Sequence, residues 1–367
     1  MITGFENMEN TVGGKKKRIW LRAAIIAAAV VLTLTVIPFC ISGAVYSAVF
    51  ARRFQTAEHL KFYVDDFEGL TEERMTFESK GRTLQGYLYS REDLDAKGVV
   101  VICHGFGGGG CNQYMDSADF FVRNGFYTFM FDATGNDLSE GSGTCGIPQY
   151  TIDLDAAISF IKQDERIGQL PVMLFGHSMG GFSACNVLNL RDDIASVAEI
   201  AGFCESTDMI AREGEQAAGK ISLILMPYVK LFETLAFGEN VSGDVIPALK
   251  NSDCTVMVIH SADDATVPIE YGYDKLYKEF GGDDRFTFVR YEDRGHSYAD
   301  ISDEAREYLK KYNDEYKAFC GEGDPSPEMK ERFLKDNLDR TVWAGALDKE
   351  LYGRIAEMFT AAAEKKG

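Results

Sequence analysis

A serine between glycines is the feature of this 367-residue sequence that points most directly to chemistry. The segment Gly176-His177-Ser178-Met179-Gly180-Gly181 follows a β-rich run and precedes a helical pattern. A serine on a sharp strand-to-helix turn needs glycine two residues to either side, because side chains at those positions would collide. The segment therefore predicts a nucleophilic Ser178, and the alternative is an ordinary glycine-rich start of a helix.

A serine nucleophile needs a general base, and the base needs a carboxylate that orients it. Among five histidines, His296 is the best candidate because it follows the last predicted strand and completes the order Ser, Asp, His along the chain. The carboxylate should follow the strand predicted at residues 254–260, where Asp263 and Asp264 compete. The alternative for His296 is a hydrogen-bonded loop residue.

The elements that would position these residues form an alternating pattern from residue 74 onward. Short β-rich runs alternate with helical patterns, which predicts an α/β fold with a mostly parallel eight-stranded sheet and helices on both faces. Runs such as Val99 to Ile102 are apolar throughout, as central parallel strands should be. Strands are predicted at 74–79, 84–90, 98–103, 126–131, 171–176, 195–200, 254–260 and 285–290, and helices near 112–123, 150–162, 179–190, 268–279 and 299–318.

Two segments interrupt or follow this alternation. Residues 203–250 lie between two strands where a single helix would suffice, so we expect a helical cap insertion. Residues 321–367 follow a stretch rich in glycine and proline and predict a C-terminal extension of two helices.

An uncharged apolar run covers residues 23–51, and a membrane-spanning helix needs about 20 apolar residues. Basic residues cluster before the run, at Lys15–Arg18 and Arg22, and only Arg52 and Arg53 follow it closely. The positive-inside rule therefore predicts a single-pass transmembrane anchor in the cell membrane.

In this topology residues 1–22 form a cytoplasmic basic tail, and residues 52–73 are a linker to an extracytoplasmic body. One alternative is a cleaved secretory signal with Ser42-Gly43-Ala44 as its cleavage site. A second alternative is a buried core helix, which would rarely have so uniform an apolar surface.

Composition narrows the class of function. The formal net charge is −19, and the excess of acidic residues lies in the body that follows the anchor. Such a body repels phosphate backbones, so we expect no nucleic-acid partner. The sequence contains no P-loop, HExxH helix or EF-hand loop, and we expect no metal and no cofactor. It does not indicate an oligomeric state.

Residues 74–318 resemble the α/β-hydrolase family, in particular its serine esterase, monoglyceride-lipase and serine-aminopeptidase-like members. The resemblance implies an α/β-hydrolase domain over residues 74–320. It also favours Asp264 over Asp263, because in relatives the acid typically precedes x-x-Val-Pro. Four motifs carry the resemblance, in the expected order: His104-Gly105-Phe106-Gly107, Phe131-Asp132-Ala133-Thr134-Gly135-Asn136-Asp137-Leu138-Ser139-Glu140-Gly141, the Ser178 segment, and the loops with Asp264 and His296.

Two backbone amides would form the oxyanion hole. One belongs to the residue after the nucleophile, Met179, and the other to the loop after the strand at 98–103. By resemblance the second amide is that of Phe106. We expect the glycines from 107 to 110 to let this loop approach the substrate closely. The chain departs from the family at Ala133-Thr134-Gly135, where relatives commonly have an Arg-Gly pair, which puts the usual role of that loop in doubt.

The expected function is hydrolysis of a small-molecule or lipid carboxylic ester through an acyl-enzyme. One alternative is a serine peptidase of the aminopeptidase-like branch, which would recruit a free amine. The other alternative is a binding protein that uses a catalytically inactive hydrolase fold. The acidic candidates for amine recognition are Glu205, Asp208, Glu213 and Glu215.

The apolar run from Ile221 to Phe237 suggests which part of the cap would contact substrate. Tyr228, Phe232 and Leu235 belong to a helical pattern with more apolar surface than one packed side requires. We expect these three side chains to line a substrate pocket over Ser178. The alternatives are an ordinary helix packed against the body and a surface that enters the nearby bilayer.

Overall fold

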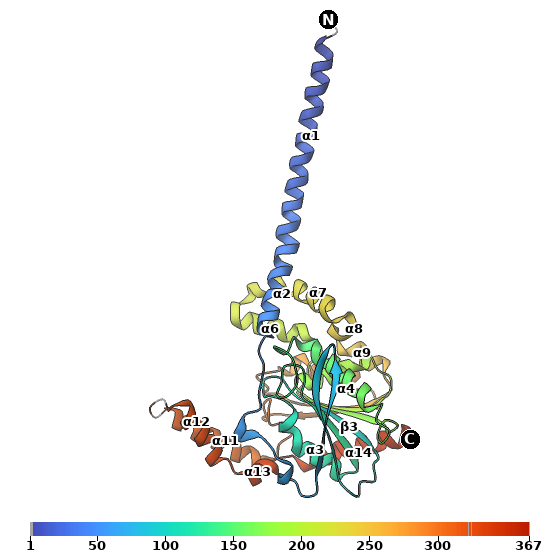
Figure 1. Ribbon diagram of the computed structural model, residues 1–367, viewed down its shortest axis with the longest axis vertical. Coiled ribbons are helices and arrows are strands. Elements are labelled where there is room, and N and C mark those ends of the chain that lie inside the picture. The colour runs from blue at the N-terminus through green and yellow to red at the C-terminus, as the bar shows by residue number, and fades with distance from the viewer. Residues whose placement is uncertain (1–2, 322, 324, 367) are drawn as a thin grey trace.

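The computed structural model describes residues 3–321, 323 and 325–366, and side chains from Lys17 onward. An eight-stranded sheet in the order β1-β2-β4-β3-β5-β6-β7-β8 forms its centre (Figure 1). β2 pairs antiparallel with β1 and β4, and all other neighbours are parallel. The strands are β1 (Thr71–Ser79), β2 (Arg82–Ser90), β3 (Gly98–Cys103), β4 (Phe126–Phe131), β5 (Val172–His177), β6 (Ile194–Ile200), β7 (Thr255–Ser261) and β8 (Phe286–Tyr291).

Helices cover both faces of this sheet. The α-helices are α1 (Thr3–Val31), α2 (Ile37–Val49), α3 (Met115–Arg123), α4 (Ile147–Ile161), α5 (Met179–Asn186), α6 (Ser206–Ala218), α7 (Met226–Phe237), α8 (Glu239–Ser242), α9 (Val245–Asn251), α10 (Tyr273–Phe280), α11 (Asp303–Gly321), α12 (Pro327–Asn337), α13 (Arg340–Ala344) and α14 (Lys349–Lys366). A π-helical turn, η1 (Leu32–Val36), joins α1 to α2, and the short 3₁₀ turns are η2 (Glu58–Leu60), η3 (Val64–Asp66), η4 (Cys111–Tyr114), η5 (Val187–Asn189), η6 (Lys220–Leu225) and η7 (Ile269–Tyr271).

The core consists of two apolar layers, one on each face of the sheet. Alternate residues of β3 enter different layers, because successive side chains of a strand point to opposite faces. Val99 and Val101 pack with α4, α5 and α10, whereas Val100 and Ile102 pack with α3 and α14. The predicted mostly parallel eight-stranded sheet with helices on both faces is therefore confirmed.

The C-terminal extension differs from the prediction of two helices, because α12, α13 and α14 follow one another. The five-residue α13 was missed because its start depends on a cap rather than on apolar spacing. The Asp339 carboxylate accepts from the Thr341 and Val342 amides there. The apolar side of α14, including Leu351, Ile355 and Phe359, forms part of the core.

The N-terminal helix extends away from the body (Figure 1). From Lys17 to Val49 it is long and apolar enough to cross a membrane, a property that signal sequences share. Its last turns are no longer isolated: Ser42, Gly43 and Tyr46 are buried against the body. The insertion between β6 and β7 contains α6, η6, α7, α8 and α9, and its η6 and α7 contact α2 (Figure 1).

Candidate active site

Ser178 occupies the sharp turn between β5 and α5. Its backbone has φ of 57° and ψ of −118°, an uncommon conformation for a residue with a side chain. The Ser178 amide donates to the Ile200 carbonyl at 2.7 Å, which fixes the turn to the next strand. A Cβ atom at Gly180 would lie 2.0 Å from the carbonyl oxygen of Cys103, so only glycine fits there. The turn therefore holds the Ser178 hydroxyl at the carboxyl end of the sheet.

The structure brings Ser178, His296 and Asp264 together. Nε2 of His296 lies 3.0 Å from Oγ of Ser178, and Nδ1 of His296 lies 2.8 Å from Oδ2 of Asp264. Asp264 follows β7 and His296 follows β8, so the parallel strands deliver all three residues to one edge of the sheet. A His296 tautomer with its proton on Nδ1 donates to Asp264 and leaves Nε2 free to accept the serine proton.

The surroundings of Asp264 keep its carboxylate ionised. Burial alone would raise the pKa of Asp264, but hydrogen bonds from His260 and His296 outweigh it and hold the pKa well below its usual range. Oδ1 accepts from the Thr266 and Val267 amides, each at 2.8 Å. Both carboxylate oxygens are therefore engaged.

The neighbouring Asp263 has a different position. Its Oδ1 accepts from the Ser261 hydroxyl at 2.6 Å and from the Gly295 amide at 2.7 Å. Asp263 thus holds the loop that carries His296, and the contact with the imidazole belongs to Asp264.

A chain of hydrogen bonds behind the imidazole connects two loops of the site. Nε2 of His177 lies 3.0 Å from the His296 carbonyl oxygen, and Nδ1 of His177 lies 3.2 Å from the Tyr114 hydroxyl. The same hydroxyl accepts from the Gly105 amide at 3.2 Å. Burial and the nearby His296 lower the pKa of His177 to about 4, so its ring stays neutral, donating through Nε2 and accepting at Nδ1. Tyr114 was missed at the sequence level, where nothing links it to the serine.

The two amides predicted for the oxyanion hole belong to the start of α5 and to the loop after β3, and a Cβ atom at Gly105 in that loop would lie 3.5 Å from the His177 carbonyl oxygen. Met179 is the first residue of α5, where a helix leaves its amide without an internal acceptor. The Phe106 amide also has no acceptor among the described residues. Phe106 is 39% exposed, and its ring packs edge-on against Phe50 and Phe54 at centroid distances of 5.9 and 4.9 Å.

In the glycine run after Phe106, the structure shows a role for Gly109 that differs from the expected approach to substrate. Gly109 has φ of 105°, and a Cβ atom there would lie 2.2 Å from the Thr56 amide nitrogen. The close approach at this position is thus to the chain's own linker rather than to a substrate.

The loop from Asp132 to Gly141, whose role the sequence left in doubt, binds that linker. Asp137 accepts from the Thr56 amide at 2.6 Å and from the Gly110 amide at 2.9 Å. Phe54 forms a parallel β-bridge with Asn136. The Asp132 carboxylate accepts from the Cys111 amide at 3.0 Å. The loop thereby joins the linker to the glycine segment that follows Phe106.

The three cap residues predicted to line a substrate pocket have other neighbours. The Tyr228 hydroxyl donates to the Leu34 carbonyl of the N-terminal helix. Phe232 packs against Tyr46, with ring centroids 5.2 Å apart. Leu235 is 69% exposed. These contacts place Tyr228 and Phe232 against the N-terminal helix, and the role of the three side chains in binding substrate stays a prediction.

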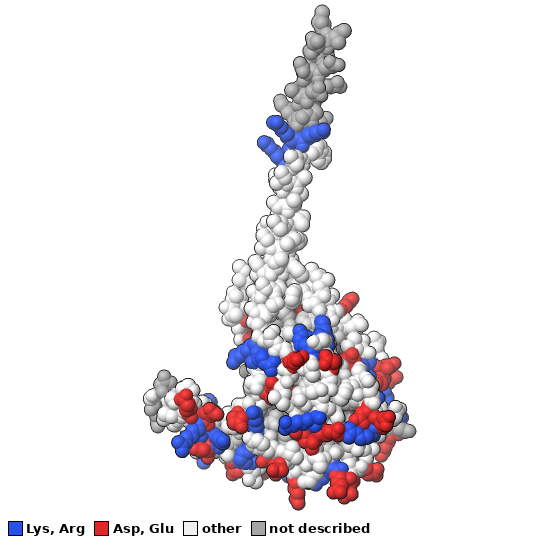
Figure 2. All heavy atoms as spheres, in the orientation of Figure 1, with Lys and Arg blue, Asp and Glu red and all other residues white. Residues whose placement is uncertain are grey.

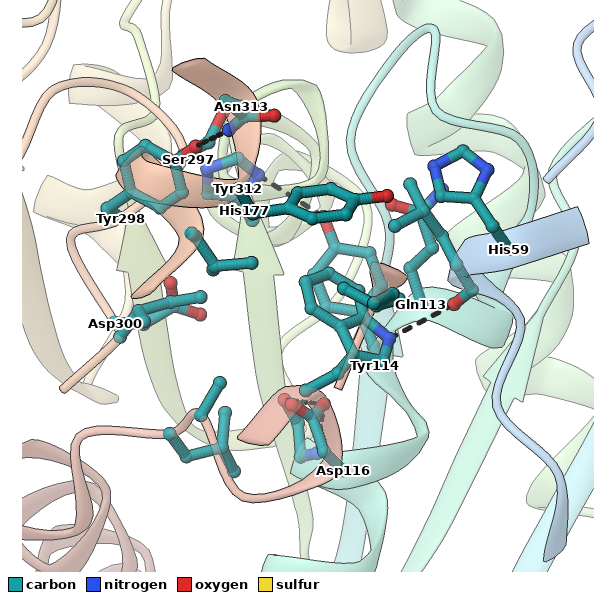
Figure 3. A pocket seen from close by; sticks show the side chains of 18 of the residues that line it. His59, Gln113, Tyr114, Asp116, His177, Ser297, Tyr298, Asp300, Tyr312 and Asn313 are labelled. Atoms are coloured by element: carbon teal, nitrogen blue, oxygen red, sulfur yellow. Dashed lines mark hydrogen bonds between the residues drawn. The ribbon is translucent and has the colours of Figure 1, made fainter. Parts of the chain in front are cut away.

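A cavity of about 490 Å³ lies beside His177 (Figure 3). Its walls come from the linker, from η4 and α3, and from the C-terminal helices. Asp116 and Asp300 both line it, and burial raises the pKa of Asp116 to about 8 and that of Asp300 to about 6. Tyr114 and His177, which hold the His296 loop, line the cavity, and Ser178 is not part of its lining. Within the described residues, no group of three or more His, Cys, Asp or Glu side chains could hold a metal ion.

Comparison with known proteins agrees with this architecture. Residues 95–253 match the model of the Hydrolase_4 family, described as serine aminopeptidase, S33. The Pyrococcus furiosus esterase Pf2001 superposes with a TM-score of 0.53 at 15% identity, over 74% of this chain and 97% of the esterase. The acetyl xylan esterase from Paenibacillus sp. R4 superposes with a TM-score of 0.50 at 14% identity, over 67% of this chain and 84% of the esterase.

At such low identity the structural likeness establishes the fold alone. None of the curated proteins matches the chain at a significant level. The resemblance inferred from the motifs is confirmed at the level of the α/β-hydrolase fold, and the family match supports a hydrolase.

Proposed function

We propose that this chain, an α/β hydrolase by its fold and by the family match over residues 95–253, is a serine hydrolase that cleaves carboxylic esters. The observation that carries the proposal is the hydrogen-bonded chain from Ser178 Oγ through His296 to Asp264, on a strained turn at the carboxyl edge of the sheet. Nucleophile, base and orienting acid recur in this geometry on unrelated folds that transfer acyl groups.

The proposed reaction has two halves. Ser178 Oγ bonds to the ester carbonyl carbon while His296 Nε2 takes the serine proton, and the carbonyl electrons move to oxygen. The Met179 and Phe106 amides would donate to that oxyanion, each contributing on the order of 10²–10³-fold in rate. Collapse breaks the bond to the alcohol, which leaves with the proton from His296. Water then repeats the sequence on the acyl-enzyme and releases the acid.

Covalent labelling tests the proposal at its centre. The full-length protein should react with a fluorophosphonate probe and should hydrolyse nitrophenyl acyl esters, and Ser178→Ala should abolish both. Ser183→Ala is a matched control, because that serine lies on α5 with its hydroxyl donating to the Met179 carbonyl at 2.9 Å. Labelling that persists in Ser178→Ala would contradict the nucleophile. An unlabelled wild-type protein would favour the inactive binding protein.

A peptidase acting at a free amino terminus is the alternative, because the matched family is described as a serine aminopeptidase. Two of its acidic candidates are already paired: Lys275 lies 2.6 Å from Asp208 and 3.8 Å from Glu205. A recruited amine would have to compete with Lys275 for both carboxylates, which favours the esterase. Parallel assays on acyl esters and aminoacyl nitroanilides separate the two activities.

We further propose that the N-terminal helix is an uncleaved anchor and that the body lies outside the cytoplasm. The apolar stretch within Lys17–Val49 and the basic residues before it support this topology. Protease added to cells with a permeabilised wall should digest the body and spare the N-terminal tail. A soluble form that begins near Val45 would instead support a cleaved signal.

A further inference from the structure

The cap exposes large apolar side chains where the N-terminal helix meets the body. In η6 none of the six residues is buried, and Ile221 and Ile224 are 71% and 68% exposed. On α7, Leu231 and Leu235 are 47% and 69% exposed. Figure 2 shows an uncharged surface that continues from the helix onto this part of the cap. Contiguous apolar surface of this kind marks an interaction site. We call Ile221, Ile224, Leu231 and Leu235 the cap surface.

Contacts between the cap and the N-terminal helix fix the position of the cap surface along the helix axis. Both η6 and α7 touch α2. Of the contacts described above, the one nearest the N-terminus of the helix joins Tyr228 to the Leu34 carbonyl. Toward the body, the Phe232 ring packs on Phe39 at 6.3 Å and on Tyr46 at 5.2 Å. Tyr46 also donates to the buried Glu233 carboxylate at 2.7 Å. The cap is therefore attached from the level of Leu34 to the end of the helix.

The length of the helix places this level relative to a bilayer. A hydrocarbon core about 30 Å thick takes about 20 helical residues at 1.5 Å each. If the core begins after Arg22, the last basic residue before the apolar run, it ends near Ser42. Leu34 then lies within the hydrocarbon core, about 18 Å from its cytoplasmic boundary and about 12 Å from its outer boundary.

The opposite arrangement, with the cap outside the hydrocarbon, conflicts with the same geometry. Only the part of the helix from Ala23 to the residue before Leu34 would then remain to cross the core, and it would span about 16 Å, roughly half the thickness. Arg22, Arg18 and Lys17 would be drawn into the hydrocarbon, at a cost of about 2.5–3.5 kcal/mol for each charge that reached its centre.

We propose that the cap surface is immersed in the outer leaflet of the membrane, with lipid acyl chains as its occupant. This inference rests on the anchor and topology proposed above. The polar groups of the region permit immersion: the Ser222 hydroxyl donates to the Gly219 carbonyl at 2.8 Å, the Lys230 ammonium lies 3.8 Å from the Glu205 carboxylate, and the long side chain of Lys220 can extend to the headgroups. A lipid-borne ester would thus reach the enzyme from the leaflet in which the cap lies.

Depth-dependent quenching tests the proposal on the full chain. A cysteine is introduced in turn at Ile224 in the cap surface, at Ile26 in the span and at Met329 on α12, in a background in which the exposed and partly exposed Cys40, Cys145 and Cys320 are replaced by alanine. Each carries a nitrobenzoxadiazole fluorophore in phosphatidylcholine vesicles with or without doxyl-labelled acyl chains. Met329 is the matched control, because it is a 53% exposed apolar residue on an element remote from the anchor (Figure 1). The parent protein without an added cysteine gives the background labelling.

We expect acyl-chain doxyl groups to quench the probes at 224 and 26 at least twofold and to leave the probe at 329 unchanged. Quenching at 26 without quenching at 224 would overturn the immersed cap and leave the anchor intact. A blue-shifted but unquenched probe at 224 would indicate a second copy of the chain as the occupant and would also overturn the proposal. Absence of quenching at both 26 and 224 would refute the anchor itself, and fluorophosphonate labelling of the same samples would report separately on the hydrolase.

Discussion

Replacing Asp264 by asparagine tests the acid of the site against a neighbour of the same type. Asp264 uses both carboxylate oxygens: Oδ1 accepts from the Thr266 and Val267 amides, and Oδ2 accepts from His296. An asparagine has only one acceptor oxygen. Because two backbone amides need that oxygen, the side-chain NH₂ would point at Nδ1 of His296.

This orientation would force the imidazole into the wrong tautomer. With an NH₂ group facing it, Nδ1 must accept a hydrogen bond, so the ring proton moves to Nε2. A protonated Nε2 cannot accept the proton of Ser178. The loss in kcat should be about 10⁴-fold, as for the corresponding change in other serine triads. Stability should also fall, because the ionised carboxylate is lost and the side-chain NH₂ would face the His260 ring, whose Nε2 lies 3.3 Å from Oδ2 and donates to the Val267 carbonyl.

Asp263→Asn is the matched control. The Ser261 hydroxyl and the Gly295 amide both donate to the same oxygen, Oδ1, so an asparagine oxygen can accept both bonds. We expect less than a tenfold loss, since a single weakened hydrogen bond is worth about 1 kcal/mol. The assay is kcat and KM on a soluble nitrophenyl ester, with fluorophosphonate labelling rates. Equal losses in the two variants, or a larger loss at Asp263, would refute the assignment of the acid.

Four further outcomes follow from the same contacts. Ser178→Ala should lower kcat by about 10⁶-fold and leave the melting temperature nearly unchanged. On acidification kcat/KM should fall, because a protonated imidazole cannot act as the base. Stability should fall in the same direction, because burial lowers the pKa of His177 to about 4, so the unfolded chain binds a proton that the folded ring does not; a melting temperature that stays constant as the pH is lowered toward 4 would contradict the buried neutral ring. Tyr46→Phe should destabilise the detergent-solubilised protein by about 1–3 kcal/mol, measured by thermal unfolding, because it removes a donor from the buried Glu233; an unchanged melting temperature would show that the bond is dispensable. Phe54→Ala should lower kcat about tenfold with little change in KM, because its ring supports Phe106, and equal loss in Phe39→Ala would contradict a local effect.

The sheet could be predicted because its signal is local and repeated. Strands such as β3 and β7 are apolar on both faces, and only a central parallel strand suits that composition. The turn at Ser178 was predictable for a similar reason, since the glycine spacing reflects a collision between atoms only a few residues apart. His296 and Asp264 required chain order and a family resemblance, because nothing local to either residue identifies its partner.

The contacts that sequence reasoning missed or misassigned depend on which surfaces meet. The apolar pattern of α7 predicted a buried side but not its neighbour, which for Phe232 is Tyr46 of the N-terminal helix. Tyr114 acts through the His177 ring, a through-space relation that no spacing encodes. The linker was expected to be a mere connection, yet Phe54 pairs through its backbone, and backbone hydrogen bonds leave little trace in residue type.

The linker connects the position of the membrane to the proposed oxyanion loop. Phe50, the residue after α2, and Phe54 both pack on the Phe106 ring, and Thr56 is bound by Asp137, which also accepts from the Gly110 amide. A loop held at both ends by the anchor-proximal segment has less freedom than a surface loop with four glycines would have alone. Ordering this loop has an entropic cost that these contacts offset before substrate arrives. An enzyme cut free of its anchor before Phe54 would lose the Phe50 contact and keep the Asp137 contact, so its activity on a soluble ester should fall only in part.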